Sequence, residues 1–200
     1  MSRFAKGWCL MSAAFVIFLW PAAAEAHLMS SGMGPFYDGA EHLLSSLDDF
    51  LGIIALALLA GQNNKQHGRY ILFALPASWI VGGFAGLMRS TEWQQPVVSS
   101  LSIVVVGAML ATRSQWTALT FAGTASLFGL LHGYLNGSSM GTTGRGWIGL
   151  MGIALTVFVS VAFLSSFSLL LKAAWTQIAV RVAGSWIVAI GLLMTGWALR

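Results

Sequence analysis

Charged side chains are scarce in this sequence, because only 8% of its 200 residues are Asp, Glu, Lys or Arg. An ordinary soluble domain carries about 25% charged residues. Hydrophobic residues make up 57% of the chain, and its mean hydropathy is +0.79. This much apolar surface excludes a disordered chain, and so few charges cannot solvate the surface of a soluble domain. The composition therefore predicts a polytopic membrane protein.

Cysteine is almost absent too, since Cys9 is the only one, and no internal disulfide can form. The sequence also lacks a basic stripe. Its net charge is +4, but the Lys and Arg residues are scattered singly, which excludes a surface for binding nucleic acid. Isolated cations between apolar runs are typical of topology signals in membrane proteins.

The amino terminus has the pattern of a secretory signal. Arg3 and Lys6 precede an apolar segment that is short for a membrane span, and Ala24-Glu25-Ala26 follows as an A-x-A cleavage pattern. We therefore predict that residues 1–26 are a cleaved signal peptide, with a retained anchor helix as the alternative. Cleavage would leave His27 as the first residue, on the outer face of the membrane.

Residues 27–200 are predicted to form a single all-α domain, a bundle of six transmembrane helices. Their apolar runs are too long and too evenly hydrophobic for barrel strands, which alternate apolar and polar residues. The predicted spans are residues 36–61, 70–88, 97–112, 116–135, 147–171 and 178–199. Residues 62–69 are expected to be a polar loop, and the glycine-rich segment 137–146 a plain connection or a mobile gate. Gly82 and Gly86 form a small-xxx-small pair, which predicts close helix packing.

The positions of Lys and Arg predict the orientation. With the mature amino terminus outside, the inner ends of the spans carry Lys65, Arg69, Arg113, Lys172 and Arg181, and the outer ends carry Arg89, Arg145 and Arg200. Six spans return the carboxy terminus to the outer face. The expected location is the cytoplasmic membrane of a bacterium.

All five carboxylates after residue 26 fall at or near the outer face in this topology: Asp38, Glu41, Asp48, Asp49 and Glu92. On one continuous helix, the positions 38, 41, 42, 45, 48 and 49 would share a face. Asp48 and Asp49 run directly into an apolar segment, so they need a cation, a proton or a water-filled cavity. The alternative is a solvated polar face in the membrane interface.

Histidines lie in the same outer layer. His132 and Asn136 are spaced i, i+4 on the fourth predicted span, facing the acidic stripe, whereas His67 is expected to be solvated in the inner loop. We predict two possible metal layers, at Asp38 and at Asp48, with His42 beside the Asp38 layer and His132 able to complete either one. A free amino-terminal His27 offers an amine and an imidazole together, an arrangement suited to copper. The candidate metal ligands are His27, Asp38, Glu41, His42, Asp48, Asp49 and His132.

Several of these residues carry a family pattern. Gly39-x-x-His42 followed by x5-Asp48, Glu92 after the second span, and Phe128-x-x-x-His132-Gly133 together resemble the HupE/UreJ family. The resemblance extends over residues 27–200, including the number of spans. It implies a permease for nickel, sometimes cobalt, that serves hydrogenase and urease maturation, with metal-binding roles for His42 and Asp48.

The chain departs from that pattern in its imidazoles. Asp49 stands where the family's first-helix motif ends in His, and Tyr134 and Asn136 stand where its fourth-helix motif has two further histidines. Imidazole suits nickel, whereas carboxylate oxygens suit harder ions.

These observations favour a transporter of a divalent transition metal, nickel by the resemblance, with cobalt, copper or zinc as other ions. The alternative is a membrane-bound metal-binding or assembly factor that does not translocate the ion. We do not expect an enzyme, because Ser138 and Ser139 have no adjacent base in the sequence. The expected partners are the metal ion and the lipid bilayer, with a homo-oligomer or an associated metalloenzyme as further possibilities.

Overall fold

The computed structural model describes residues 31–89, 95–113, 115–141 and 144–200. Within these ranges the protein forms seven α-helices and no strand, which confirms the all-α prediction. The helices are α2 (Pro35–Ser45), α3 (Leu47–Asn63), α4 (Lys65–Leu87), α5 (Pro96–Ala111), α6 (Ala118–Met140), α7 (Gly146–Leu170) and α8 (Ala174–Ala198). The predicted signal peptide, His27 and Glu92 lie outside the described residues.

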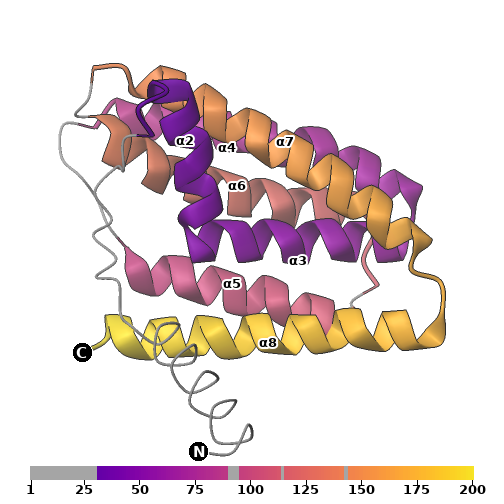
Figure 1. The fold of residues 1–200 in the computed structure, drawn as a ribbon. Helices are drawn as coiled ribbons and strands as arrows, with labels where there is room; N and C mark the ends of the chain where they lie inside the picture. The colour runs from indigo at the N-terminus through magenta and orange to yellow at the C-terminus, as the bar shows by residue number, and fades with distance from the viewer. Residues whose placement is uncertain (1–30, 90–94, 114, 142–143) are drawn as a thin grey trace, which may run out of the picture.

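Two groups of helices make up the fold (Figure 1). Helices α3, α4, α6 and α7 form a bundle in which α4 packs on α6 and α3 packs on α7. Helix α2 crosses one end of this bundle and packs against α7. Helices α5 and α8 run side by side as an antiparallel pair, and this pair joins the bundle mainly through α3.

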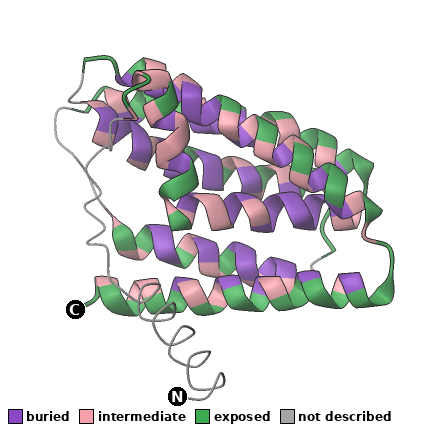
Figure 2. Ribbon diagram, viewed as in Figure 1, coloured by how far each residue is buried: buried purple, intermediate pink, exposed green. Residues whose placement is uncertain are grey.

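The helix lengths and compositions are those of a multi-pass membrane protein. Four helices, α4, α6, α7 and α8, are long and apolar enough to cross a bilayer. A fifth crossing is counted if α2 and α3 together are one broken span, and α5, with 16 residues, is shorter. Large apolar side chains such as Phe163 and Leu193 are exposed on the outer faces of the helices. Figure 2 shows that much of α8 is exposed. In a bilayer these faces would contact lipid.

The prediction of one continuous helix over residues 36–61 is wrong. The chain bends by 74° between α2 and α3, at Ser46, which has an extended backbone. Three groups bind the carbonyl oxygen of His42: the Ser46 amide, the Ser46 hydroxyl and the Ser45 hydroxyl. Serine side chains that bond to nearby backbone groups compete with the helical ladder, and here they satisfy the end of α2.

The two predicted loops are also wrong in extent. Helices α3 and α4 are separated by Asn64 alone, whose side chain caps α4 by accepting from the amides of Gln66 and His67. His67 therefore lies in the first turn of α4 rather than in a solvated loop. It is buried between the Asn64 side chain and the Trp116 carbonyl. In the other predicted loop, residues 137–140 belong to α6.

Glycines bring α4 and α6 into close contact, as the Gly82–Gly86 pair predicts. A Cβ atom on Gly82 would lie 2.2 Å from the carbonyl oxygen of Leu130 on α6. In return, a Cβ atom on Gly133 of α6 would lie 2.2 Å from the carbonyl oxygen of Trp79. Only glycine fits a backbone approach this close, so the spacing between these two helices is set by sequence.

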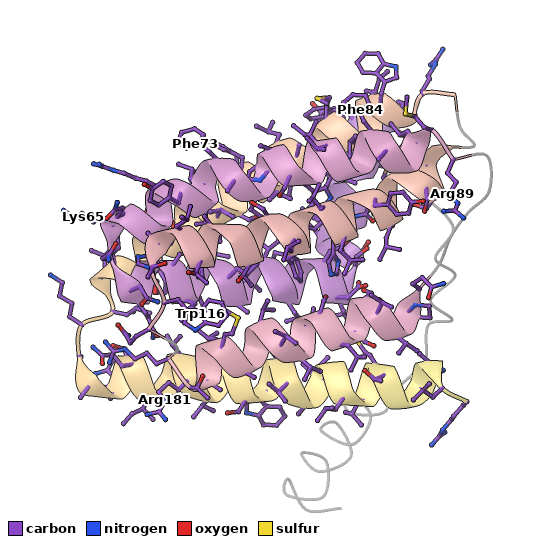
Figure 3. All side chains as sticks on the ribbon, turned by 180° about the vertical axis from the view of Figure 1, so that it is seen from behind. Lys65, Phe73, Phe84, Arg89, Trp116 and Arg181 are labelled. Carbon is purple, nitrogen blue, oxygen red and sulfur yellow. The ribbon has the colours of Figure 1, made fainter. Side chains whose placement is uncertain are left out.

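Charges divide between the two ends of the bundle. The described acids lie on α2 and the first turn of α3. Lys65 and Arg181 lie at the opposite end, while Arg89 lies at the acidic end (Figure 3). The cations predicted for inner and outer faces thus fall at opposite ends of the molecule. Which end faces the cytoplasm stays a prediction.

Candidate metal site

Three side chains that bind metals in other proteins meet at the acidic end of the bundle. Asp48, Asp49 and His132 each offer one ligand atom, and these atoms lie within 4.8 Å of one another. This is the one group of at least three His, Cys, Asp or Glu side chains within the described ranges that is suited to a metal ion. The sequence predicted all three residues, although two of them come from α3 and the third from α6.

The bend between α2 and α3 puts the two aspartates at the start of a helix. Asp48 and Asp49 occupy the first turn of α3, where the positive end of the helix dipole stabilises carboxylates. His132 lies eight residues before the end of α6 at Met140, or about 12 Å inside that end. Asp49 and His132 are buried, whereas Asp48 is half-buried, so the group is reached from the Asp48 side.

The imidazole of His132 is held at both nitrogens. Its Nδ1 lies 2.5 Å from Oδ1 of Asp49, and its Nε2 lies 2.7 Å from the Ser102 hydroxyl on α5. That hydroxyl donates its single hydrogen to the Ser99 carbonyl at 2.6 Å, so it accepts from Nε2–H of the ring. A carboxylate oxygen only accepts, so the contact with Oδ1 of Asp49 uses Nδ1–H of the same ring, and a metal ion would take the place of that hydrogen. Histidines that bind metals commonly hold the second ring nitrogen in this way.

Both carboxylates are held by neighbouring polar side chains. The Asn136 amide donates to Oδ2 of Asp49 at 2.9 Å, and the Ser99 hydroxyl donates to Oδ2 of Asp48. Each aspartate therefore has one oxygen fixed by a neutral donor. The opposite oxygen of Asp49 faces His132. Neutral donors orient the two adjacent carboxylates without cancelling their charge.

His42 is linked to the group indirectly. Its Nε2 lies 3.0 Å from Oδ1 of Asn136, and a carbonyl oxygen only accepts, so the ring donates. Asn136 in turn donates to Asp49. A chain of two hydrogen bonds thus connects α2 through α6 to the first turn of α3. His42 therefore contacts the group of Asp48, Asp49 and His132 only through Asn136 and is not part of it.

Aromatic rings close the apolar side of the site. Phe128 stacks on His132 with ring centroids 4.0 Å apart, and Trp79 lies 5.8 Å from the same imidazole. Gly52 of α3 leaves room for the Phe128 ring. A Cβ atom at this position would lie 2.0 Å from the ring. Apolar walls lower the local dielectric and strengthen every charge interaction within the site.

The remaining predicted ligands lie elsewhere. Asp38 is on α2, where its Oδ1 accepts from the amide and the hydroxyl of Ser31, each at 2.6 Å. Glu41 is half-buried on α2 and is not part of the group. The bend turns both residues away from the helix axis that carries Asp48, so the predicted upper layer does not form around His132. His27 lies outside the described residues.

Sequence reasoning missed two hydroxyl groups of the site, those of Ser99 and Ser102. They lie on α5, to which no site residue was assigned. A signal was present, because the serines at 99, 100 and 102 interrupt an otherwise apolar segment. Hydroxyls within an apolar helix bond either to their own backbone or to a neighbouring helix. Asn136 was noticed for its spacing from His132 but was not placed among the ligands.

The geometry fits a divalent cation. Ligand atoms at about 2.0–2.2 Å from a transition metal lie at most about 4.4 Å apart, so small side-chain shifts would close the group around an ion. Two carboxylates and one imidazole supply two negative charges and mixed oxygen and nitrogen donors. This donor set suits Zn, Co, Ni and Mn more than soft ions, which prefer sulfur.

Comparison with known proteins yields one family match. A family model described as HupE / UreJ protein matches residues 14–194. No curated protein and no solved structure matches the chain significantly. The match extends over most of the sequence, including every helix that contributes to the site, and the chain therefore belongs to the HupE/UreJ family.

Proposed function

We propose that this protein transports a divalent transition-metal ion across a membrane, with nickel as the first candidate and cobalt as the second. The observation that carries the proposal is the cluster of Asp48, Asp49 and His132 inside an apolar helix bundle. Two adjacent carboxylates in such surroundings are costly unless a cation offsets them. Family membership supports a metal-related role.

The ion would enter at the acidic end. Asp48, the half-buried member of the group, would meet it first, and His132 and Asp49 would then replace further water ligands. Ser99 and Ser102 place the site at the contact between the α5–α8 pair and the main bundle. A movement of that pair relative to α3 would open the site toward the other end.

A second function is favoured by the side chains beyond the site. Toward the opposite end of α3, Ile53, Leu56 and Leu59 are fully or almost fully buried, and these apolar side chains offer an ion no ligand along this helix. This observation favours a membrane-bound metal-binding or assembly factor that holds the ion without moving it. Neither function requires a chemical reaction, and we propose that the protein is not an enzyme.

Uptake into proteoliposomes distinguishes the two functions. We expect the wild-type protein to accumulate nickel inside the vesicles and Asp48→Asn to lose uptake, because the change removes a ligand charge at nearly constant volume. Asp38→Asn is the matched control and should transport normally. Binding without uptake by the wild-type protein would establish the second function. Absence of both would contradict a metal function altogether.

We further propose six membrane crossings, with α2 and α3 as one broken crossing and α5 as a short one. Helix α5, at 16 residues, is about 24 Å long, against about 30 Å for the hydrocarbon core, and local thinning of the bilayer accommodates the difference. Both termini would then lie outside the bacterial cytoplasmic membrane. A carboxy-terminal reporter active only outside should be active, and activity of a cytoplasmic reporter instead would overturn this orientation.

A further inference from the structure

A second polar site lies at the opposite end of the bundle from the metal-suited group. There a cavity of about 200 Å³ is formed where α3, α5 and α7 end and α8 begins. Its polar lining includes Gln62, Asn64, Arg113, Lys172 and Gln177. Drug-sized ligands occupy pockets of about 300–1,000 Å³, so this cavity fits a small group rather than a whole metabolite.

The charge of this cavity is positive. Arg113 and Lys172 line it, and no Asp or Glu does. Lys65 and Arg181 lie at the same end of the molecule, as Figure 3 shows. A guanidinium and an ammonium group have no acceptor atoms, so these side chains recognise anions and repel a metal ion.

Polar atoms in this region lack partners. Both side-chain amide atoms of Gln62 are buried and make no hydrogen bond within the described residues, and the same holds for Nε of Arg113. Buried polar groups are almost always satisfied in native proteins, so each exception requires an explanation. A ligand that accepts hydrogen bonds would satisfy the Arg113 Nε–H and the Gln62 amide N–H together.

The backbone at Arg113 is held in an unusual conformation. Its φ of 51° is the one positive value at a non-glycine residue in the described part of the chain. The side chain is fixed in turn by Gln177, whose Oε1 accepts from Nη1 of Arg113 at 2.8 Å. A left-handed residue just past a helix end is a common way to end a helix, and together with the Gln177 contact it sets the position of the guanidinium at the cavity.

A purely structural role accounts for only part of this arrangement. Cations near helix carboxy termini offset the negative end of the helix dipole, and three helices end here. That role needs charge alone and leaves the buried Gln62 amide and the Arg113 Nε–H unexplained. We propose that this cavity is a binding site for a phosphate-type oxyanion, supplied either by a phospholipid headgroup or by free phosphate. Several donors from different helices suit a tetrahedral anion, and arginine matches phosphate geometry.

Thermal unfolding of the purified full-length protein in a maltoside detergent, which contains no phosphate, tests the site. One arm compares inorganic phosphate with sodium chloride at equal ionic strength, and the other adds phosphatidylglycerol to the micelles. We expect at least one arm to raise the Tm of the wild-type protein. A response to phosphate alone identifies the free anion, and a response to phosphatidylglycerol alone identifies the headgroup.

Two variants make the test specific. Arg113→Gln should raise about tenfold the concentration of phosphate or lipid that is needed for a given rise in Tm, because it removes a charge-assisted hydrogen bond. Gln62→Met removes the amide at similar volume and without a charge change. It should also weaken binding of the anion, and it is the test variant if Arg113→Gln does not fold. Lys65→Gln is the control, because Lys65 is exposed at the same end and does not line the cavity. A Tm that neither arm changes, or an equal response in all three variants, would overturn the proposal.

Discussion

Nδ1 of His132 lies 2.5 Å from Oδ1 of Asp49, across the contact between α6 and α3. The two residues are 83 positions apart in the chain, and both are buried. The opposite nitrogen of the ring is held by Ser102, and the opposite oxygen of Asp49 by Asn136. A metal ion would therefore replace one short contact while the outer hydrogen bonds keep both ligands oriented.

Ser102→Ala should weaken metal binding about 10–100-fold, the range typical for loss of a residue that orients a metal-binding histidine. The physical reason is that the Nε2–H of His132 loses its acceptor. Isothermal titration of the purified protein with nickel measures the effect. Ser100→Ala is the matched control on the same helix, because its hydroxyl contacts Thr195 instead. Ser102→Thr should restore binding, and wild-type affinity in Ser102→Ala would show that the ring needs no such support.

His42→Ala should weaken metal binding about tenfold while leaving one ion bound per chain. His42 acts through Asn136 and is one hydrogen bond away from Asp49. Metal titration followed by measurement of stoichiometry checks this outcome. Complete loss of the ion, at unchanged thermal stability, would mean that His42 is a direct ligand, as the sequence resemblance implies.

Gly133→Val should destabilise the protein by about 1–3 kcal/mol, the usual cost of overpacking. The new side chain would collide with the Trp79 carbonyl across the α4–α6 contact. Gly123→Val is the control on the same helix, because a Cβ atom at Gly123 meets nothing within 4 Å. Thermal unfolding in detergent compares the two. Equal stability of both variants would contradict the close approach of these helices.

Much of the fold was predictable because apolar runs and glycine spacing are local signals. The long helices begin and end within a few residues of the predicted spans, and the Gly82–Gly86 pair does lie at a helix contact. The bend at Ser46 was not predictable from periodicity. It arises from competition of two serine hydroxyls for the carbonyl of His42, and the pattern of polar residues is the same for a straight helix.

The site was predictable in its chemistry but only partly in its membership. Asp48 and Asp49 stand out because carboxylates seldom precede an apolar run directly, and His132 stands out as a lone imidazole in an apolar span. Asp38 shares their helical periodicity, yet the bend separates it from them. Ser99 and Ser102 were missed, because the position of α5 beside α3 depends on long-range packing that spacing within one segment does not encode.

The residues that hold the ion are tested most directly by X-ray absorption at the metal edge. The sample is purified wild-type protein loaded with nickel, compared with Asp49→Asn at equal protein concentration. The wild-type spectrum should show one imidazole nitrogen together with oxygen ligands, at one ion per chain, and Asp49→Asn should hold little or no metal. Equal metal content in both proteins, or a wild-type spectrum without an imidazole contribution, would contradict a metal site at Asp48, Asp49 and His132.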